Sequence, residues 1–292
     1  MIIKEYRIVL PISVEEFKIA QLYTFAEASK NETGGGEGVE VCRNEPFWNV
    51  PLVEGGKASD GQFTHKVYRI QSKVPGWLRA ITPQGSLEFH EEAWNAYPLC
   101  KTEFSNPAYM KENFRLTIQT LHLPDRGGSP NVHNLSPDKL KKREVVHVDI
   151  ANDEINPKAL SVSLSYSLRD YREKWDPQKF RSVKTNRGPL IGPWQDQSEP
   201  VMCCYKLVTV EFKWFPVGPK IESFIHKSER RLFLSFHRQL FCSIDEWSGL
   251  TMANIRKLEE ETKADLDKQR NHGDIRSHFL AFFIACSNSV FF

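Results

Sequence analysis

Several common signatures are missing from this chain of 292 residues. Its six cysteines include no Cys-x-x-Cys pair, so a zinc site or a thioredoxin-like centre is disfavoured and reduced thiols are expected. No run approaches the roughly 20 apolar residues of a membrane-spanning helix. The segment Met1–Glu5 does not read as a secretory signal, which predicts a cytoplasmic protein. A formal net charge of +2 is too balanced to indicate nucleic-acid binding.

Motifs for phosphate binding and catalysis are missing as well. The glycine-rich run at 34–38 fits neither the dinucleotide fingerprint nor the P-loop, and it precedes a strand, so a flexible loop is the better interpretation. There is no nucleophile elbow and no metal-ligand spacing. His122 and His237 are interpreted as satisfied structural histidines. An enzyme stays the rival class, with His65 as a base, but His65 points away from Thr64 and Lys66. We therefore expect neither catalysis nor a cofactor.

Apolar and aromatic residues are plentiful instead. Hydrophobic residues make up 40% of the chain, and it contains 19 Phe and 7 Trp. That is enough for one large core or two smaller ones, with a wide apolar interior.

The order of the predicted elements indicates an α+β fold. Strands are predicted at 3–10, 39–42, 62–72, 86–89, 113–123, 144–150 and 205–214. Helices are predicted from Ser13, as the cap of a Ser13–Glu16 capping box, to about Lys30, and at 74–82, 220–242 and 251–270. The segment 152–179 is predicted to be an irregular surface excursion. Because strands and helices do not alternate regularly, an antiparallel sheet with helices packed on it is favoured over a doubly wound sheet.

Two faces that should be apolar each carry a charge. A strand of period two places Gln62, Thr64 and Lys66 on one face. Helical spacing from Ile255 to Leu266 places the carboxylate of Glu259 within an apolar stripe. A buried charge is costly unless it has a partner or a polar ligand. These two charges therefore suggest a site for a polar ligand. The alternatives to such a ligand are that both faces are solvated, or that Lys66 and Glu259 pair with each other.

Long stretches of the chain resemble the soluble, single-domain phosphatidylinositol transfer proteins. The resemblance extends from about Ile2 to Lys268. It rests on the segments 26–38 (AEASKNETGGGEG), 93–98 (AWNAYP), 182–190 (SVKTNRGPL), 205–209 (YKLVT), 236–242 (FHRQLFC) and 259–262 (EEET). Chance agreement over such lengths is negligible.

The resemblance implies a fold and a function. The family fold is a START-like helix-grip, in which long helices hold a concave, mostly antiparallel sheet around one phospholipid. The lipid transfer domain is expected at 1–270, followed by a divergent tail at 271–292. The implied function is transfer of phosphatidylinositol or phosphatidylcholine between membranes, with the lipid as cargo, by a monomer that visits membranes transiently. A sensor that presents phosphatidylinositol to a lipid kinase is the alternative.

The resemblance also implies site residues. The inositol headgroup is expected at Thr64, Lys66, Asn95 and Glu259. The phosphate is expected near Gln21, Cys100, Thr102 and Thr120, with Cys100 open to thiol reagents when the lid lifts. Trp214 and Phe215 match the tryptophan pair with which the family docks on membranes, although both could be core residues at a strand end. Ser182 matches a phosphorylatable serine in the regulatory loop.

Three departures from the family pattern stand out. Phe215 replaces the second tryptophan and keeps apolar area without the indole N–H. The segment 157–176 is expanded. The tail carries an apolar block at 278–286 and ends on Val290–Phe292, and it could plug the interior, insert at an interface or aggregate.

Overall fold

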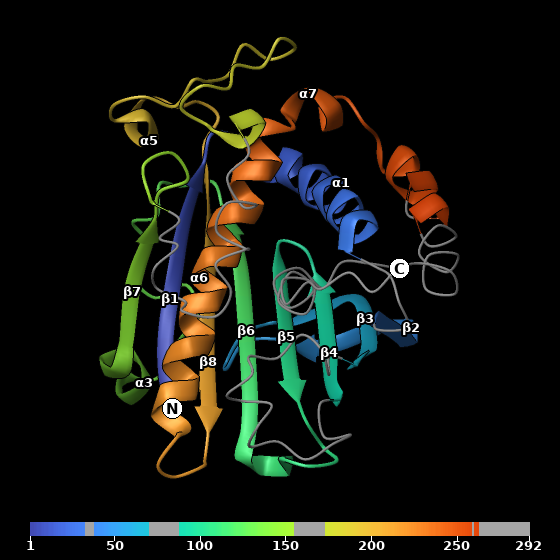
Figure 1. Cartoon of the computed structure of the whole chain (residues 1–292), viewed down its shortest axis with the longest axis vertical. Coiled ribbons are helices and arrows are strands. Elements are labelled where there is room, and N and C mark those ends of the chain that lie inside the picture. Colours follow the sequence, from blue (N-terminus) through green and yellow to red (C-terminus); the bar gives the residue numbers. More distant parts are fainter. Residues whose placement is uncertain (33–37, 70–87, 155–172, 259, 263–292) are drawn as a thin grey trace.

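The computed structural model describes residues 1–32, 38–69, 88–154, 173–258 and 260–262. Its centre is an eight-stranded sheet with the order β2-β3-β4-β5-β6-β8-β1-β7 (Figure 1). The strands are β1 (Ile2–Leu10), β2 (Gly38–Pro51), β3 (Ala58–Arg69), β4 (Glu88–Ala96), β5 (Leu99–Ser105), β6 (Phe114–Leu123), β7 (Arg143–Val148) and β8 (Met202–Phe212). Neighbours are antiparallel except β1 and β7, which confirms the predicted α+β class with a mostly antiparallel sheet.

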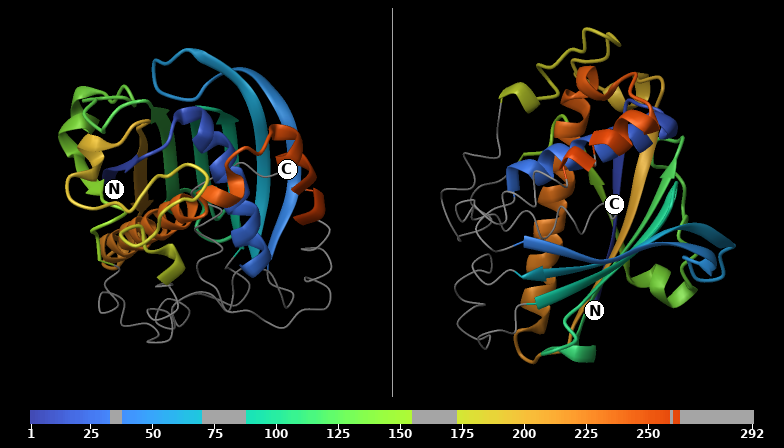
Figure 2. Two further views of the ribbon diagram at one scale, coloured as in Figure 1. Left: turned by 90° about the horizontal axis from the view of Figure 1, so that it is seen from above. Right: turned by 90° about the vertical axis from the view of Figure 1, so that its right-hand side faces the viewer.

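Two long helices cover one face of this sheet. Helix α6 (Gly218–Cys242) runs along β8 and β1, and α1 (Val14–Glu32) crosses the same face near the upper ends of the strands (Figures 1 and 2). Shorter helices are α3 (Pro137–Lys142), α5 (Trp194–Gln197), α7 (Ile244–Trp247) and the 3-10 turns Lys111–Asn113 and Glu173–Trp175. Residues 252–258 and 260–262 are also helical.

The capping box predicted at the start of α1 is present. The backbone N–H of Glu16 donates to Oγ of Ser13 over 3.1 Å, and that of Ser13 donates to the carboxylate of Glu16 over 2.8 Å. The apolar side of α1 is buried at Phe17, Leu22 and Phe25, as the helical spacing predicts. These apolar contacts fix α1 over the sheet, because most of the stability of a helix in a protein comes from the tertiary packing of its apolar face.

Strand lengths at one end of the sheet differ from the prediction. The strand predicted at 39–42 extends to Pro51, the one at 86–89 extends to Ala96, and β5 (Leu99–Ser105) was not predicted. These segments contain many polar residues, and cross-strand pairing with β3 and β6 stabilises them in place of local propensity. The predicted helix at 74–82 and the tail at 271–292 lie outside the described residues.

The sheet has an inner face, which α1 and α6 cover, and an outer face. Tyr6 of β1 lies on the inner face, where its hydroxyl donates to the carbonyl of His226 in α6 over 2.9 Å. Its neighbours Glu5 and Arg7 lie on the outer face, since successive side chains of a strand alternate. A large apolar core occupies the inner face, and a smaller cluster of Phe47, Leu52 and Phe63 supports the β2–β3 hairpin on the outer face.

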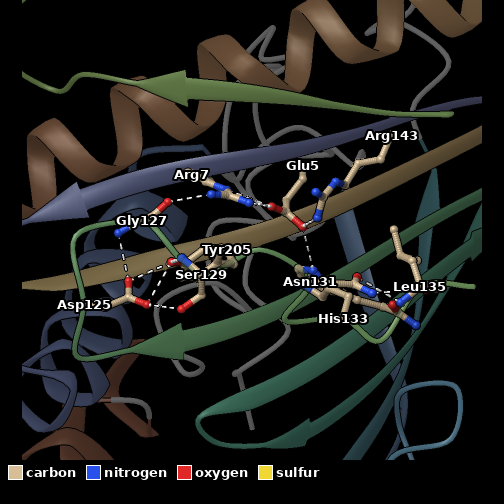
Figure 3. Close-up of polar contacts among 11 residues, drawn as sticks. Glu5, Arg7, Asp125, Gly127, Ser129, Asn131, His133, Leu135, Arg143 and Tyr205 are labelled. Atoms are coloured by element: carbon tan, nitrogen blue, oxygen red, sulfur yellow. Dashed lines mark hydrogen bonds and ion pairs between the residues drawn. The ribbon is translucent and has the colours of Figure 1, made fainter. Parts of the chain in front are cut away.

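A buried ionic network lies on the outer face of the sheet, beneath the loop that follows β6 (Figure 3). Glu5 is fully buried, and its carboxylate accepts from Arg7 over 2.8 Å, from Arg143 over 2.9 Å and from His133 over 3.2 Å. Nε2 of His133 lies 3.1 Å from the carbonyl of Gln119, so both ring nitrogens face acceptors. Burial raises the pKa of Glu5, but the bonds from His133 and Arg7 outweigh burial and leave the pKa below the usual 4.5.

Candidate functional site

The strand register brings the sequence-predicted site residues onto the inner face. One row of directly paired residues crosses five strands and consists of Gln62, Asn95, Cys100, Thr120 and Lys206. The next row begins with Thr64, Ala93 and Thr102. Directly paired residues share a face, with Cβ atoms about 5 Å apart. Thr64, Lys66, Asn95, Cys100, Thr102 and Thr120 therefore lie on the same face of the sheet, and we call this set the polar strip.

Lys66 is buried at 2% exposure, so its face is not solvated as one alternative held. Its ammonium lies 3.5 Å from a carboxylate oxygen of Glu91, its directly paired neighbour on β4. Tyr68 donates a hydrogen bond to the other oxygen of Glu91. The ammonium also lies 6.0 Å from the ring centroid of Phe25 in α1. Lys66 thus has a carboxylate partner that the sequence did not indicate. Glu259, the predicted partner, lies outside the described residues.

Helix α1 covers this strip with polar groups of its own. Gln21 and Thr24 are 2% and 1% exposed. Nε2 of Gln21, the hydroxyl of Thr24 and the hydroxyl of Thr64 have no hydrogen-bond partner among the described residues. Leaving a buried polar group unpaired costs about 1–3 kcal/mol. Three such groups on facing elements indicate a face built to bind something polar.

Cys100 lies in the middle of the strip and is a neutral thiol. Its sulfur donates to the side-chain oxygen of Asn95 over 3.1 Å. Burial raises the pKa of Cys100 to about 12. Because the thiolate is the reactive form, a thiol whose pKa lies this far above neutrality reacts slowly while it stays covered. Reaction with thiol reagents therefore requires the inner face to open.

A second polar cluster on the inner face was not predicted, and we call it the Lys206 cluster: Lys206, Glu229, His122 and His237. Lys206 on β8 and Glu229 on α6 are both fully buried. Burial raises the pKa of Glu229 to about 8, against the opposing effect of Lys206, and burial lowers the pKa of Lys206. Neither carboxylate oxygen of Glu229 has a hydrogen-bond partner among the described residues.

The two histidines of this cluster are only half satisfied, contrary to their interpretation from sequence. Nδ1 of His122 lies 3.0 Å from the carbonyl of Pro98, and Nδ1 of His237 lies 2.6 Å from that of Phe233. Nε2 of each ring has no partner in the described part of the chain. Burial lowers both pKa values to about 3, so both rings are neutral near pH 7.

The signal that could have located this cluster is the same one that singled out Glu259. Lys206 is the only charged residue on a strand face that otherwise reads Cys204, Val208 and Val210. Glu229 follows Ile225 by four residues in an apolar helical stripe and precedes Phe233 by four. A single charge in an apolar stripe marks a buried polar group in both cases.

Ser182 lies in the segment between the turn Glu173–Trp175 and α5, and it is 2% exposed. Its hydroxyl donates to Asp245 of α7 over 2.5 Å and accepts from the backbone of Thr185 over 2.9 Å. Asp245 also accepts from the backbone of Val183 and Lys184 over 2.9 Å. Burial raises the pKa of Asp245, but these bonds outweigh it and the pKa is lowered. Asp245 therefore fixes the conformation of residues 182–185.

Trp214 and Phe215 follow the end of β8 and differ in exposure. Phe215 is 99% exposed, which contradicts its interpretation as a core residue. Trp214 is half-buried and packs edge-on against Tyr109 and Phe212, with ring centroids 5.6 and 5.8 Å apart. Of the two, Phe215 alone presents its whole aromatic ring to solvent.

Two searches of the described residues were negative. They contain no group of three His, Cys, Asp or Glu side chains that could hold a metal ion. None of their helices is long and apolar enough to cross a membrane.

A mostly antiparallel sheet with a polar inner face beneath two long helices defines a helix-grip α+β protein with an interior binding face. Comparison with known proteins then identifies the family. The family model described as phosphatidylinositol transfer protein matches residues 1–264. The chain therefore belongs to the phosphatidylinositol transfer protein family.

Relatives at high identity support this assignment. The chain is 49% identical to human phosphatidylinositol transfer protein beta isoform, over 94% of this chain and 97% of that protein. It is 45% identical to phosphatidylinositol transfer protein 1 of Dictyostelium discoideum, with the same coverage. It is also 44% identical to rat membrane-associated phosphatidylinositol transfer protein 1, over 90% of this chain but only 20% of that larger protein.

Proposed function

We propose that this protein binds one molecule of phosphatidylinositol or phosphatidylcholine and transfers it between membranes. The observation that carries the proposal is the family match over residues 1–264. The unpaired polar groups at Gln21, Thr24 and Thr64 support it, because they lie on a covered face beside the large apolar core. The protein works as a cytoplasmic monomer without catalysis or a cofactor, and the lipid is its cargo.

The physical need for a carrier follows from the acyl chains. Burial of one methylene group is worth about 0.8 kcal/mol, so two chains with roughly thirty methylenes oppose escape from a bilayer by about 25 kcal/mol. A barrier of that size corresponds to a rate on the order of 10⁻⁶ per second. An apolar protein interior lowers this barrier because it replaces the bilayer as the solvent for the chains.

We assign the headgroup to the polar strip. Thr64, Lys66, Asn95 and Glu259 hold the inositol, whose hydroxyls donate to the carboxylate and amide oxygens. A choline headgroup offers no hydroxyl donor to Glu259, so these four residues favour the inositol lipid. The phosphate, common to both lipids, binds near Gln21, Cys100, Thr102 and Thr120. Lys206 follows Thr120 in the same row and supplies a positive charge there. Hydrogen bonds to charged groups are worth about 1.5–3 kcal/mol each.

Membrane docking is assigned to Phe215, with Trp214 as its support. The fully exposed ring of Phe215 can enter a lipid interface at little cost, because it has no packing contact to lose. Trp214 positions the turn through its packing against Tyr109 and Phe212. The apolar tail at 278–292 lies outside the described residues and has no assigned role.

Regulation by phosphorylation is assigned to Ser182. A phosphate on its hydroxyl would stand where the carboxylate of Asp245 now accepts, and like charges repel at that distance. Phosphorylation therefore releases residues 182–185 from α7. Hydrogen exchange of these backbone amides should rise in Ser182→Asp and much less in Ser182→Asn. Equal exchange in the two variants would count against a charge-based release.

The test of the function is transfer of labelled phosphatidylinositol and phosphatidylcholine between vesicles, combined with mass spectrometry of the lipid that co-purifies. A carrier retains one intact phospholipid and moves both labels. A sensor that presents phosphatidylinositol to a kinase retains the lipid but does not move it in bulk. An enzyme yields an altered lipid. Absence of bound lipid and of transfer would overturn the proposal.

A further inference from the structure

Lys206 and Glu229 are the charged members of the Lys206 cluster, and their side chains interact electrostatically on the inner face. Both side chains are fully buried, one on β8 and the other on α6. The ammonium of Lys206 lies 5.1 Å from the ring centroid of Phe233, one helical turn after Glu229. Lys206 in turn follows Cys100 and Thr120 in the row of paired residues to which the lipid phosphate is assigned. The pair therefore borders the phosphate position.

The other titratable groups around this pair are neutral near pH 7. In the described part of the chain, Tyr6 of β1, Cys100 of β5, Cys204 of β8, His122 of β6 and His237 of α6 act electrostatically on Lys206 or Glu229. Burial raises the pKa of both thiols to about 12 and also raises the pKa of the phenol. It lowers the pKa of both imidazoles to about 3. The net charge here therefore depends on Lys206 and Glu229.

Charge balance then couples this pair to the cargo. Without an anion and above about pH 8, Lys206 and Glu229 are neutral as a pair, as ammonium with carboxylate, whereas below that pH Glu229 already holds a proton. A phosphodiester brings one negative charge next to Lys206 at any pH near neutrality. A surplus negative charge in a low-dielectric interior is strongly unfavourable. It is balanced when the pair binds one more proton, which leaves an ammonium beside a neutral carboxylic acid.

We propose that the Lys206–Glu229 pair is a proton-binding site that, in mildly alkaline solution, takes up one proton from solvent when an anionic phosphodiester enters, and that Glu229 holds this proton while the lipid stays bound. The inference rests on the proposed function. It explains why neither oxygen of Glu229 has a partner among the described residues, since a neutral carboxylic acid needs fewer hydrogen-bond donors around it than a carboxylate does.

Coupling of this kind has a defined pH dependence. The pKa of Glu229 is about 8 without the lipid, and the bound phosphodiester raises it further. Below about pH 8, Glu229 is protonated in both states and the affinity for lipid is independent of pH. Above it, binding must take up a proton, so affinity falls by up to tenfold per pH unit until Glu229 is ionised in both states. The proposal thus predicts a higher affinity for lipid below about pH 8 than above it.

The first experiment locates the proton by infrared spectroscopy of the lipid-loaded protein at pH 9. We expect the C=O stretch of a protonated carboxyl, recognised by its shift in D2O, which the ester carbonyls of the lipid do not show; this band should be lost in Glu229→Gln and retained in Glu222→Gln. Glu222 is a matched control, because it is buried on the same helix but accepts from the backbone of Phe212 over 2.9 Å. A loaded protein without this band, or with a band that survives in Glu229→Gln, would overturn the proposal.

The second experiment measures the coupling. Native mass spectrometry after incubation with limiting vesicles of phosphatidylinositol and phosphatidylcholine gives the ratio of loaded to empty chain from pH 7 to 9.5. The ratio should fall above about pH 8 in the wild type and stay flat in a double variant, Lys206→Met with Glu229→Gln, which has no charge to titrate. Equal slopes would refute the coupling. Loss of all lipid from the wild type would instead refute the proposed function.

Discussion

The two faces of the sheet treat buried polar groups in opposite ways. On the outer face, both oxygens of Glu5 accept from Arg7, Arg143 and His133. On the inner face, Gln21, Thr24, Thr64 and Glu229 each keep at least one buried polar atom without a partner among the described residues. Both sets are similarly buried, so burial alone does not distinguish them. Buried polar networks with all their hydrogen bonds contribute to the stability and specificity of the fold. Buried polar groups without hydrogen-bond partners lower the stability, and here they mark a binding face.

The outer face is not wholly satisfied, since Nε of Arg143 has no partner in the described part of the chain. That exception is small, because another nitrogen of the same guanidinium donates to Glu5 over 2.9 Å. The inner groups differ in kind, because whole hydroxyls and a whole carboxylate are left unpaired. The contrast predicts that substitutions of polar groups cost more stability on the outer face than on the inner face, and that removal of an inner hydroxyl without a described partner raises stability.

The largest effect is expected for Glu5→Gln. The change leaves Arg7, Arg143 and His133 facing a neutral amide in a buried site, which should destabilise the fold by about 3–5 kcal/mol. Urea unfolding measures this change. Glu229→Gln is the matched substitution on the inner face, and it should cost less than about 1 kcal/mol because neither oxygen of Glu229 accepts a hydrogen bond from the described residues. Equal losses in the free energy of unfolding for the two variants would contradict the proposed difference between the faces.

The same network predicts a loss of stability in acid. The pKa of Glu5 is lower in the folded chain than the usual 4.5, so folding favours the ionised form. Its contribution is complete above about pH 5 and disappears as the pH falls through 4.5 toward the lowered folded pKa. Melting temperatures between pH 6 and 3 should fall more steeply in the wild type than in Glu5→Gln. Parallel curves would mean that Glu5 does not carry the acid sensitivity.

A smaller effect of opposite sign is expected for Thr64→Val. Removal of an unpaired buried hydroxyl should raise the stability of the chain, measured without added lipid, by about 1 kcal/mol. Ser129→Ala on the outer face should lower it by a similar amount, because that hydroxyl donates to Asp125 over 2.7 Å. Thr64→Val should also reduce phosphatidylinositol transfer about tenfold, the equivalent of 1.4 kcal/mol. Gained stability with unchanged transfer would remove Thr64 from the headgroup site.

The smallest effect is expected for Phe215→Trp. An indole prefers the membrane interface more than a phenyl ring, because its N–H can bond there. Vesicle affinity should increase by about 1 kcal/mol or less, roughly fivefold at most. Vesicle co-sedimentation at several lipid charges measures the change. Equal affinity of both proteins at every lipid charge would contradict a docking role for this position.

Much of the fold was predictable from local sequence signals. The Ser13–Glu16 capping box gave the start of α1, and apolar periodicity gave α6, β1 and β8 to within a few residues. The strand β5 and most of β2 were missed, because polar residues such as Thr102 and Glu103 alternate there with few apolar ones. Those segments form strands because they pair with neighbouring strands of the sheet, and the local sequence does not show this pairing.

The site was predictable only in part. Lys66 was noticed together with Thr64 on one strand face aimed at the interior, and the family resemblance supplied the residues around it. Glu91 was missed, since a carboxylate in an alternating strand reads as solvent-exposed until α1 covers that face. Lys206 and Glu229 carried the same signal as Glu259, but their proximity depends on the packing of α6 on β8. Which charges meet across layers is a property of the tertiary structure.

The most direct test of the central claim compares two lysines on opposite faces of the sheet. Transfer of labelled phosphatidylinositol and phosphatidylcholine should be measured in parallel for the wild type, Lys66→Ala and Lys101→Ala. Lys101 is paired with Trp94 on the outer face and serves as the control. We predict that Lys66→Ala loses phosphatidylinositol transfer and keeps phosphatidylcholine transfer, while Lys101→Ala keeps both. Equal loss of both lipids in Lys66→Ala, or no loss of either, would contradict the account.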